Sequence, residues 1–147
     1  MDSLRNKIER WLTHETYSFK EVSNKDNIFH FLIKHAGESG TPVDIFEPSS
    51  QPGILVIGCK TNMKNSQIVR YLNLSDTEKK KFEDKMGEFC KSIGAVFFFQ
   101  AEDGIRKIGV YVVLDNKDSI DSTNVISAIN KAAEMHDKTS KYLLKTF

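Results

Sequence analysis

The sequence predicts an α+β domain built round an antiparallel sheet, and three patterns support this. Apolar residues recur at helical spacing near both ends of the chain, they alternate with period two between residues 17 and 60, and two apolar runs flank an Asp-Gly pair. Successive short strands joined by turns pair as an antiparallel meander. The length of 147 residues is typical of one domain, so we expect a single α+β domain over residues 1–147.

The first expected element is an amphipathic helix near the N-terminus. Four apolar residues fall on one of its faces: Leu4, Ile8, Trp11 and Leu12. Ser3 or Asp2 can cap its free amides. A helix this short is marginal alone, so we expect its apolar face to pack against the rest of the domain.

Four strands are expected next, at residues 17–23, 28–35, 42–46 and 54–59. The segments between them are rich in Asn, Asp, Gly, Ser and Pro, which favour turns. In the second strand, Phe29, Phe31 and Ile33 share one face, whereas Ile28, His30 and Leu32 share the other. These four strands form the predicted meander.

Residues 63–72 fit either a short helix or an extension of the sheet, and we favour the helix. A capping box follows, in which the Ser75 hydroxyl accepts from the Glu78 amide and the glutamate reaches back. The helix after it carries Phe82, Met86, Phe89, Cys90 and Ile93 at helical spacing. Gly94 is expected to end this helix.

The clearest hairpin pairs residues 95–101 with residues 105–114 around Glu102-Asp103-Gly104. Both of its strands are apolar on both faces, so we expect it to be central in the sheet or packed against a partner chain. A long C-terminal helix then opens at Ser119 or Ser122. One stripe of it is apolar apart from a histidine: Val125, Ile126, Ile129, Ala132, Ala133, His136 and Leu143.

Composition excludes several classes of protein. A net charge of +1 gives no global attraction to nucleic acid or to an acidic membrane. Cys59 and Cys90 both stand among apolar residues, which indicates buried free thiols in a reducing compartment. The N-terminus lacks the pattern of a signal peptide and no apolar run is long enough to span a bilayer. We therefore expect a cytoplasmic protein that does not contact a membrane.

Local motifs for catalysis or cofactor binding are not visible. His30 and His35 are five residues apart on an expected strand and point to opposite faces, which disfavours a shared metal. Gly37 and Gly40 are too few for a phosphate loop. The cysteines and serines are explained by the core, turns and caps. We expect no enzymatic activity, no metal and no cofactor.

The pattern resembles two related groups of proteins. The residues that carry the resemblance are the helix with Trp11, the meander around residues 29–33 and 42–46, the capped helix, the aromatic hairpin and the long last helix. One group is a mainly archaeal family of small proteins of unknown function, and the other is the type III secretion chaperone-like superfamily, which includes YbjN-like proteins. The resemblance implies a chaperone-like fold and a homodimer that holds segments of other proteins. Those chaperones are typically strongly acidic, whereas this chain is near neutral.

Two functional hypotheses follow. The first is a non-enzymatic protein-binding module, chaperone-like or regulatory, that associates with itself or with another protein through the hairpin. Its expected self-association residues are Phe98, Val110, Tyr111 and Val112.

The alternative is a small nucleic-acid-associated regulator that uses the basic segment 59–94. This segment has eight Lys or Arg against five acidic residues. Phe29, Phe31 and the run 97–99 could form a stacking platform beside its basic residues. No basic residue interrupts the phenylalanine run, so core packing is the preferred interpretation and nucleic acid is the less favoured partner.

Overall fold

The computed structural model describes residues 3–36, 40–92, 95–102, 105–115 and 117–146, with the backbone alone for residues 62, 92, 95–102, 105–107 and 117. The helices are α1 (Leu4–His14), α2 (Asn65–Leu72), α3 (Asp76–Ser92) and α4 (Ser122–Thr146), with a short 3-10 helix η1 at Lys117–Ser119. The strands are β1 (Phe19–Glu21), β2 (Asn27–Ala36), β3 (Thr41–Pro48), β4 (Leu55–Asn62), β5 (Ala95–Glu102) and β6 (Ile105–Leu114). The predicted α+β class and the helix favoured for residues 63–72 are confirmed.

The strands form one antiparallel sheet in the order β1-β2-β3-β4-β6-β5, with five long strands and the three-residue β1. The predicted meander and hairpin are parts of this same sheet, because β6 pairs with β4 from Leu55↔Leu114 to Asn62↔Lys107. Within the hairpin, β6 is central and β5 is the edge strand. The tip at residues 103–104 lies outside the described residues.

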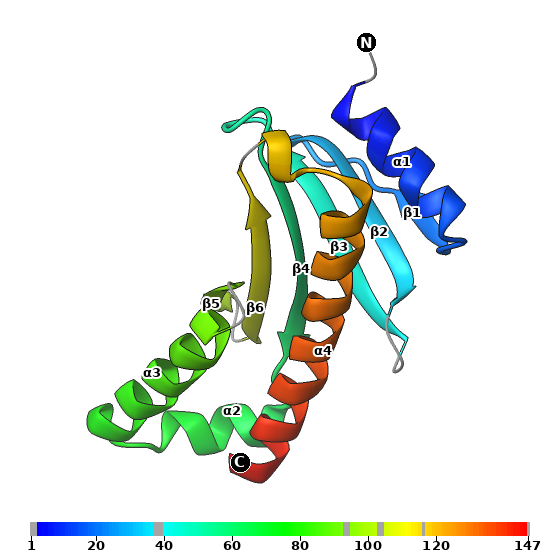
Figure 1. The fold of residues 1–147 in the computed structure, drawn as a ribbon. Helices are drawn as coiled ribbons and strands as arrows, with labels where there is room; N and C mark the ends of the chain where they lie inside the picture. Colours follow the sequence, from blue (N-terminus) through cyan, green and yellow to red (C-terminus); the bar gives the residue numbers. More distant parts are fainter. Residues whose placement is uncertain (1–2, 37–39, 93–94, 103–104, 116, 147) are drawn as a thin grey trace.

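One face of the sheet carries the main core. Alternate residues of β2, β3, β4 and β6 are buried there against Ile8 and Leu12 of α1 and against the apolar stripe of α4. Figure 1 shows α4 running along β4 and β3, with α1 beside β2. Phe29 and Phe31 belong to this core, which confirms core packing over a stacking platform for these two residues.

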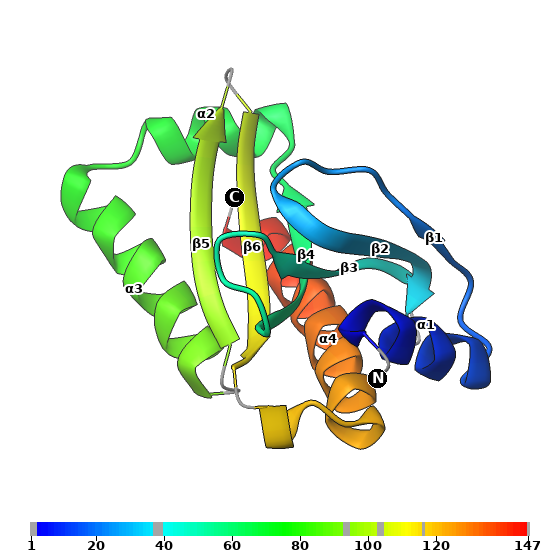
Figure 2. The ribbon, with the colours of Figure 1, turned by 90° about the horizontal axis from the view of Figure 1, so that it is seen from above.

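The same face is covered near β6 by the middle helices. Met63 and Tyr71 pack with Phe82 of α3, Ile108 of β6 and Leu143 of α4. A smaller cluster links α3, β6 and α4 through Cys90, Val110 and Met135. Figure 2, seen from above, shows α3 alongside β5 and α4 on the other side of β6. All four helices therefore pack on one face of the sheet.

Side-chain caps fix where the helices begin. The Ser3 hydroxyl accepts from the Asn6 amide, and the predicted capping box is confirmed by reciprocal bonds between Ser75 and Glu78 of 3.2 and 3.3 Å. The C-terminal helix begins at the expected Ser122, but its cap is Asp121, whose Oδ1 accepts from the Asn124 amide at 2.8 Å. Asp is about as favourable as Ser at the N-cap, and its negative charge also interacts favourably with the positive end of the helix dipole. The predicted end at Gly94 lies outside the described residues.

Candidate functional site

The face of the sheet opposite the helices, which we call the open face, is more apolar than a solvated sheet face usually is. Its central positions are His30, Leu32, Asp44, Phe46, Val56, Gly58, Lys60, Tyr111 and Val113. Val113 is 40% exposed although it lies on the internal strand β6, and the other large apolar side chains are half-buried. An antiparallel sheet with one covered face normally alternates apolar and polar residues. This sheet is apolar on both faces.

A histidine–carboxylate pair lies in the middle of the open face. Nε2 of His30 donates to Oδ1 of Asp44 at 2.8 Å, and Nδ2 of Asn27 approaches Nδ1 of His30 at 3.5 Å. The His30 ring also packs on Phe46, at 5.4 Å between centroids. Both ring nitrogens of His30 therefore face a partner within the protein, and these contacts orient the ring on the open face.

Tyr111 lies across two glycines of neighbouring strands. A Cβ atom added at Gly58 or at Gly109 would collide with its ring, so only glycine leaves room for the ring to lie flat on the sheet. The ring also meets Phe46 edge to face at 6.4 Å. Burial, and then the nearby Asp44 and Cys59 charges, raise the pKa of Tyr111 to about 12.

The four expected self-association residues do not share one face of the sheet. Tyr111 is on the open face. Val110 and Val112 point to the other face and are buried beneath the helices, because successive residues of a strand alternate. Phe98 pairs with Gly109 in the register, and its side chain lies outside the described residues. The hairpin is thus covered on the helix side, whereas its open face lacks a covering element among the described residues.

Three further groups that could take part in covalent or acid–base chemistry are buried or half-buried: Cys59, Cys90 and His136. Both cysteines are buried and free, as predicted. Burial raises the pKa of the Cys90 thiol to about 11, and burial together with the charges of Asp44 and Asp137 raises that of Cys59 to about 12. His136 lies 3.1 Å from the Thr61 hydroxyl, and burial lowers its pKa against the opposing effect of Asp137.

His30 and His35 do not come together. His35 Nδ1 lies 3.4 Å from the Gly40 carbonyl at the end of β2, whereas His30 is on the open face. Over the described part of the chain, no three His, Cys, Asp or Glu side chains are grouped so that they could hold a metal ion.

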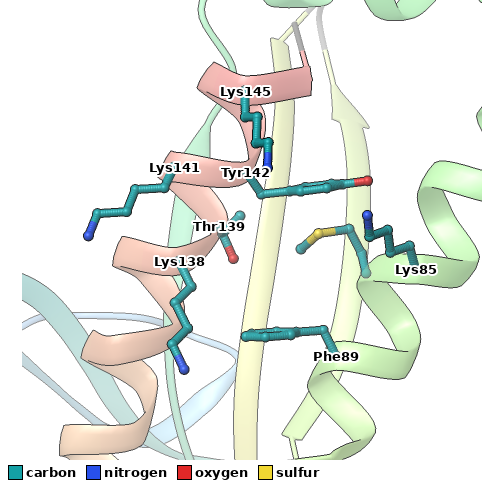
Figure 3. Close-up of a pocket in the computed structure, with 8 residues that line it drawn as sticks. Lys85, Phe89, Lys138, Thr139, Lys141, Tyr142 and Lys145 are labelled. Atoms are coloured by element: carbon teal, nitrogen blue, oxygen red, sulfur yellow. The ribbon is translucent and has the colours of Figure 1, made fainter.

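A pocket lies between α3 and α4, and we call it the lysine-rimmed pocket (Figure 3). Its volume is about 340 Å³. Eight of the described residues line it: Lys85, Met86, Phe89, Lys138, Thr139, Lys141, Tyr142 and Lys145. The walls are almost entirely apolar and four lysines surround them, and none of these eight described residues carries a carboxylate.

This pocket was missed at the sequence level because it joins distant segments. The basic residues of segment 59–94 separate, since Lys60 is on the open face, Arg70 is on α2 and Lys85 is at the pocket. The other three lysines at the pocket come from the last three turns of α4. The spacing of Lys138, Lys141 and Lys145 by three and four residues is the signal that could have indicated a basic face.

Among the described residues, no helix is long and apolar enough to cross a membrane.

Comparisons with known proteins place this fold in a family. A family model described as "Uncharacterized conserved protein (DUF2299)" matches residues 4–140. A solved structure described as the crystal structure of an uncharacterized protein from Methanothermobacter thermautotrophicus is similar, with a TM-score of 0.78 and 18% identity over 98% of this chain and 99% of that chain. This likeness shows a shared fold. No curated protein matches. The chain belongs to the uncharacterised conserved family DUF2299.

Proposed function

We propose that the protein is a non-enzymatic protein-binding module that forms a homodimer through the open face of its sheet. The observation that carries this proposal is the one-sided placement of the helices, which leaves Leu32, Phe46 and Val113 on a face that nothing in the described chain covers. Removing apolar area from water contributes roughly 25 cal/mol per Å². An apolar patch of this kind on a soluble protein typically marks an interface.

A second copy of the chain is the partner that this face fits best. A two-fold interface places the same apolar patch on both sides, so the surface must be complementary to itself. The near-neutral chain has a net charge of +1, which gives little repulsion between copies. The open face carries Asp44 and Lys60, charges of opposite sign, so it has no single sign that would select an acidic or a basic partner.

Other observations support a binding role. Three groups that could take part in covalent or acid–base chemistry are engaged or protonated: His30 faces Asp44 and Asn27, and burial raises the pKa of both thiols. The resemblance to the type III secretion chaperone-like superfamily also supports a homodimer, because those chaperones hold segments of other proteins as homodimers. It therefore favours a chaperone-like or regulatory role. Two buried free thiols are typical of a cytoplasmic protein.

Sedimentation velocity of the wild-type chain and of two matched variants tests the proposal. Val113→Lys places a charge on the open face, whereas Val69→Lys makes the same change on α2, where Val69 is 58% exposed. We expect a dimer at about ten micromolar for the wild type and for Val69→Lys, and a shift to monomer for Val113→Lys, because burying an unpaired charge costs several kcal/mol. Val110 is unsuitable for this test, since it is buried in the core.

A strict monomer at tens of micromolar would overturn the homodimer. Equal dissociation of both variants would also count against it, since the open face would then be no different from α2. Binding of a labelled oligonucleotide that falls steeply with salt would instead support the nucleic-acid-associated regulator that uses segment 59–94.

A further inference from the structure

We propose that the lysine-rimmed pocket between α3 and α4 binds a small organic anion with a flat apolar ring system. This site is separate from the open face, because α3 and α4 pack on the opposite side of the sheet. Its volume of about 340 Å³ is at the lower end of the range for small-molecule sites, roughly 300–1,000 Å³. That size suits a ligand of one or two fused rings.

The two aromatic walls favour a flat ring. Tyr142 of α4 and Phe89 of α3 bound the pocket on two sides (Figure 3). Met86 is also among the lining residues. The Tyr142 ring is held in place by Phe82, which stacks on it at 5.7 Å with an interplanar angle of 10°. A wall that is fixed before binding loses little conformational entropy when a ring packs against it.

The rim favours a negative charge. Lys85 Nζ lies 5.1 Å from the centre of the Tyr142 ring, and Figure 3 shows both Lys85 and Lys145 extending toward this ring. Lys138 lies 5.3 Å from the centre of the Phe89 ring and pairs with Glu134 at 2.8 Å. In the described part of the chain, Lys85, Lys141 and Lys145 have no such carboxylate partner. An anion at the rim would therefore meet uncompensated positive charge.

A buried hydroxyl at the wall of the pocket is an independent observation. Thr139 is 2% exposed, and its Oγ1 has no hydrogen-bond partner among the residues that the structure describes. Buried hydroxyls are nearly always bonded, and a threonine in a helix commonly bonds the carbonyl one turn earlier. A polar atom of a bound ligand would supply the missing partner. Charge, ring walls and the unpaired hydroxyl thus indicate one ligand class.

The test is a titration followed by NMR, with three probes that separate the features of the ligand. 2-Naphthoate has the ring and the charge, 2-naphthamide has the same ring without the charge, and decanoate has the charge with a flexible chain. We expect 2-naphthoate to bind saturably and shift the amides of α3 and α4. We expect it to bind about tenfold more tightly than 2-naphthamide, since a hydrogen bond to a charged group contributes roughly 1.5–3 kcal/mol.

Matched variants assign the binding to the pocket. Lys85→Gln should weaken 2-naphthoate several-fold and leave 2-naphthamide unchanged, whereas Lys91→Gln, an exposed change on α3 outside the lining, should alter neither. Tyr142→Leu should weaken both naphthalene probes. Val113→Lys should leave binding intact, so a failure of the homodimer and a failure of this site would be distinguishable.

Three results would overturn the proposal. These are an absence of saturable shifts in α3 and α4 at millimolar 2-naphthoate, equal affinity for the acid and its amide, and equal loss of binding in Lys85→Gln and Lys91→Gln. Tighter binding of decanoate than of 2-naphthoate would overturn the preference for a flat ring.

Discussion

Single side chains determine what their neighbours can be, and Tyr111 is the clearest case. Its ring covers Gly58 and Gly109 and touches Phe46, so four residues from three strands depend on one another. The sequence alone could not place Gly58 beneath this ring, because Gly58 is on β4 and Tyr111 is on β6, and their pairing follows only from the cross-strand register. The buried state of Cys59, in contrast, could be predicted from its apolar neighbours and is confirmed.

Two glycine substitutions should change the free energy of unfolding in opposite directions. A Cβ at Gly58 would lie 2.5 Å from the Val110 carbonyl oxygen and inside the Tyr111 ring. The backbone oxygen cannot move away cheaply, so Gly58→Ala should lower the free energy of unfolding by about 1–3 kcal/mol. Gly87→Ala on α3 has open space and should raise it by about 0.5–1 kcal/mol. Urea unfolding of both variants checks this, and a Gly58→Ala protein as stable as wild type would contradict the position of the ring.

Three buried groups should make stability decline in alkaline solution. Folding raises the pKa of Cys90 to about 11 and those of Cys59 and Tyr111 to about 12, whereas in the unfolded chain thiols ionise near 9 and the phenol near 10. The unfolded chain thus releases these protons first. Their stabilising contribution is complete below about pH 8.5 and is lost as pH rises toward the folded values.

Urea unfolding from pH 7 to pH 10.5 measures this loss. Each group can contribute up to about 1.4 kcal/mol per pH unit, and Cys59→Ala should reduce the alkaline slope. An unchanged slope in that variant would show that the Cys59 thiol ionises in the folded protein.

At the scale of elements, local signals predicted most of the structure. The spacing of Ile8 and Leu12 predicted α1, and the Ser75–Glu78 capping box predicted the start of α3. The Asp-Gly pair predicted the β5–β6 hairpin. The pairing of β4 with β6 was beyond prediction. It joins segments about fifty residues apart, and neither strand carries a local mark of its partner.

The docking of α1 on the sheet can be tested by two matched substitutions. Leu12 is buried in the core, so Leu12→Ala should cost about 2–5 kcal/mol. Leu72 is 48% exposed at the end of α2, so Leu72→Ala should lower the free energy of unfolding by about 0.5 kcal/mol or less. Fluorescence of Trp11, the single tryptophan and a residue of α1, follows the unfolding. Equal effects of both changes would mean that α1 does not pack as described.

At the scale of the whole molecule, the placement of the helices is the decisive feature. The sequence indicated a hairpin that is apolar on both faces, and this alone suggested a partner. It could not show which face the helices cover, because that depends on how four helices far apart in the chain pack over one sheet. For the same reason it missed the lysine-rimmed pocket, whose walls come from α3 and α4.

The most direct test of the proposed homodimer is a spin label at position 113. Cys59 and Cys90 are buried, so Val113→Cys and the control Val69→Cys can each be labelled selectively. We expect the label at 113 to become immobilised and dipolar-coupled to its symmetry mate at tens of micromolar, while the label at 69 stays mobile. Equally mobile, uncoupled spectra at both positions would contradict it.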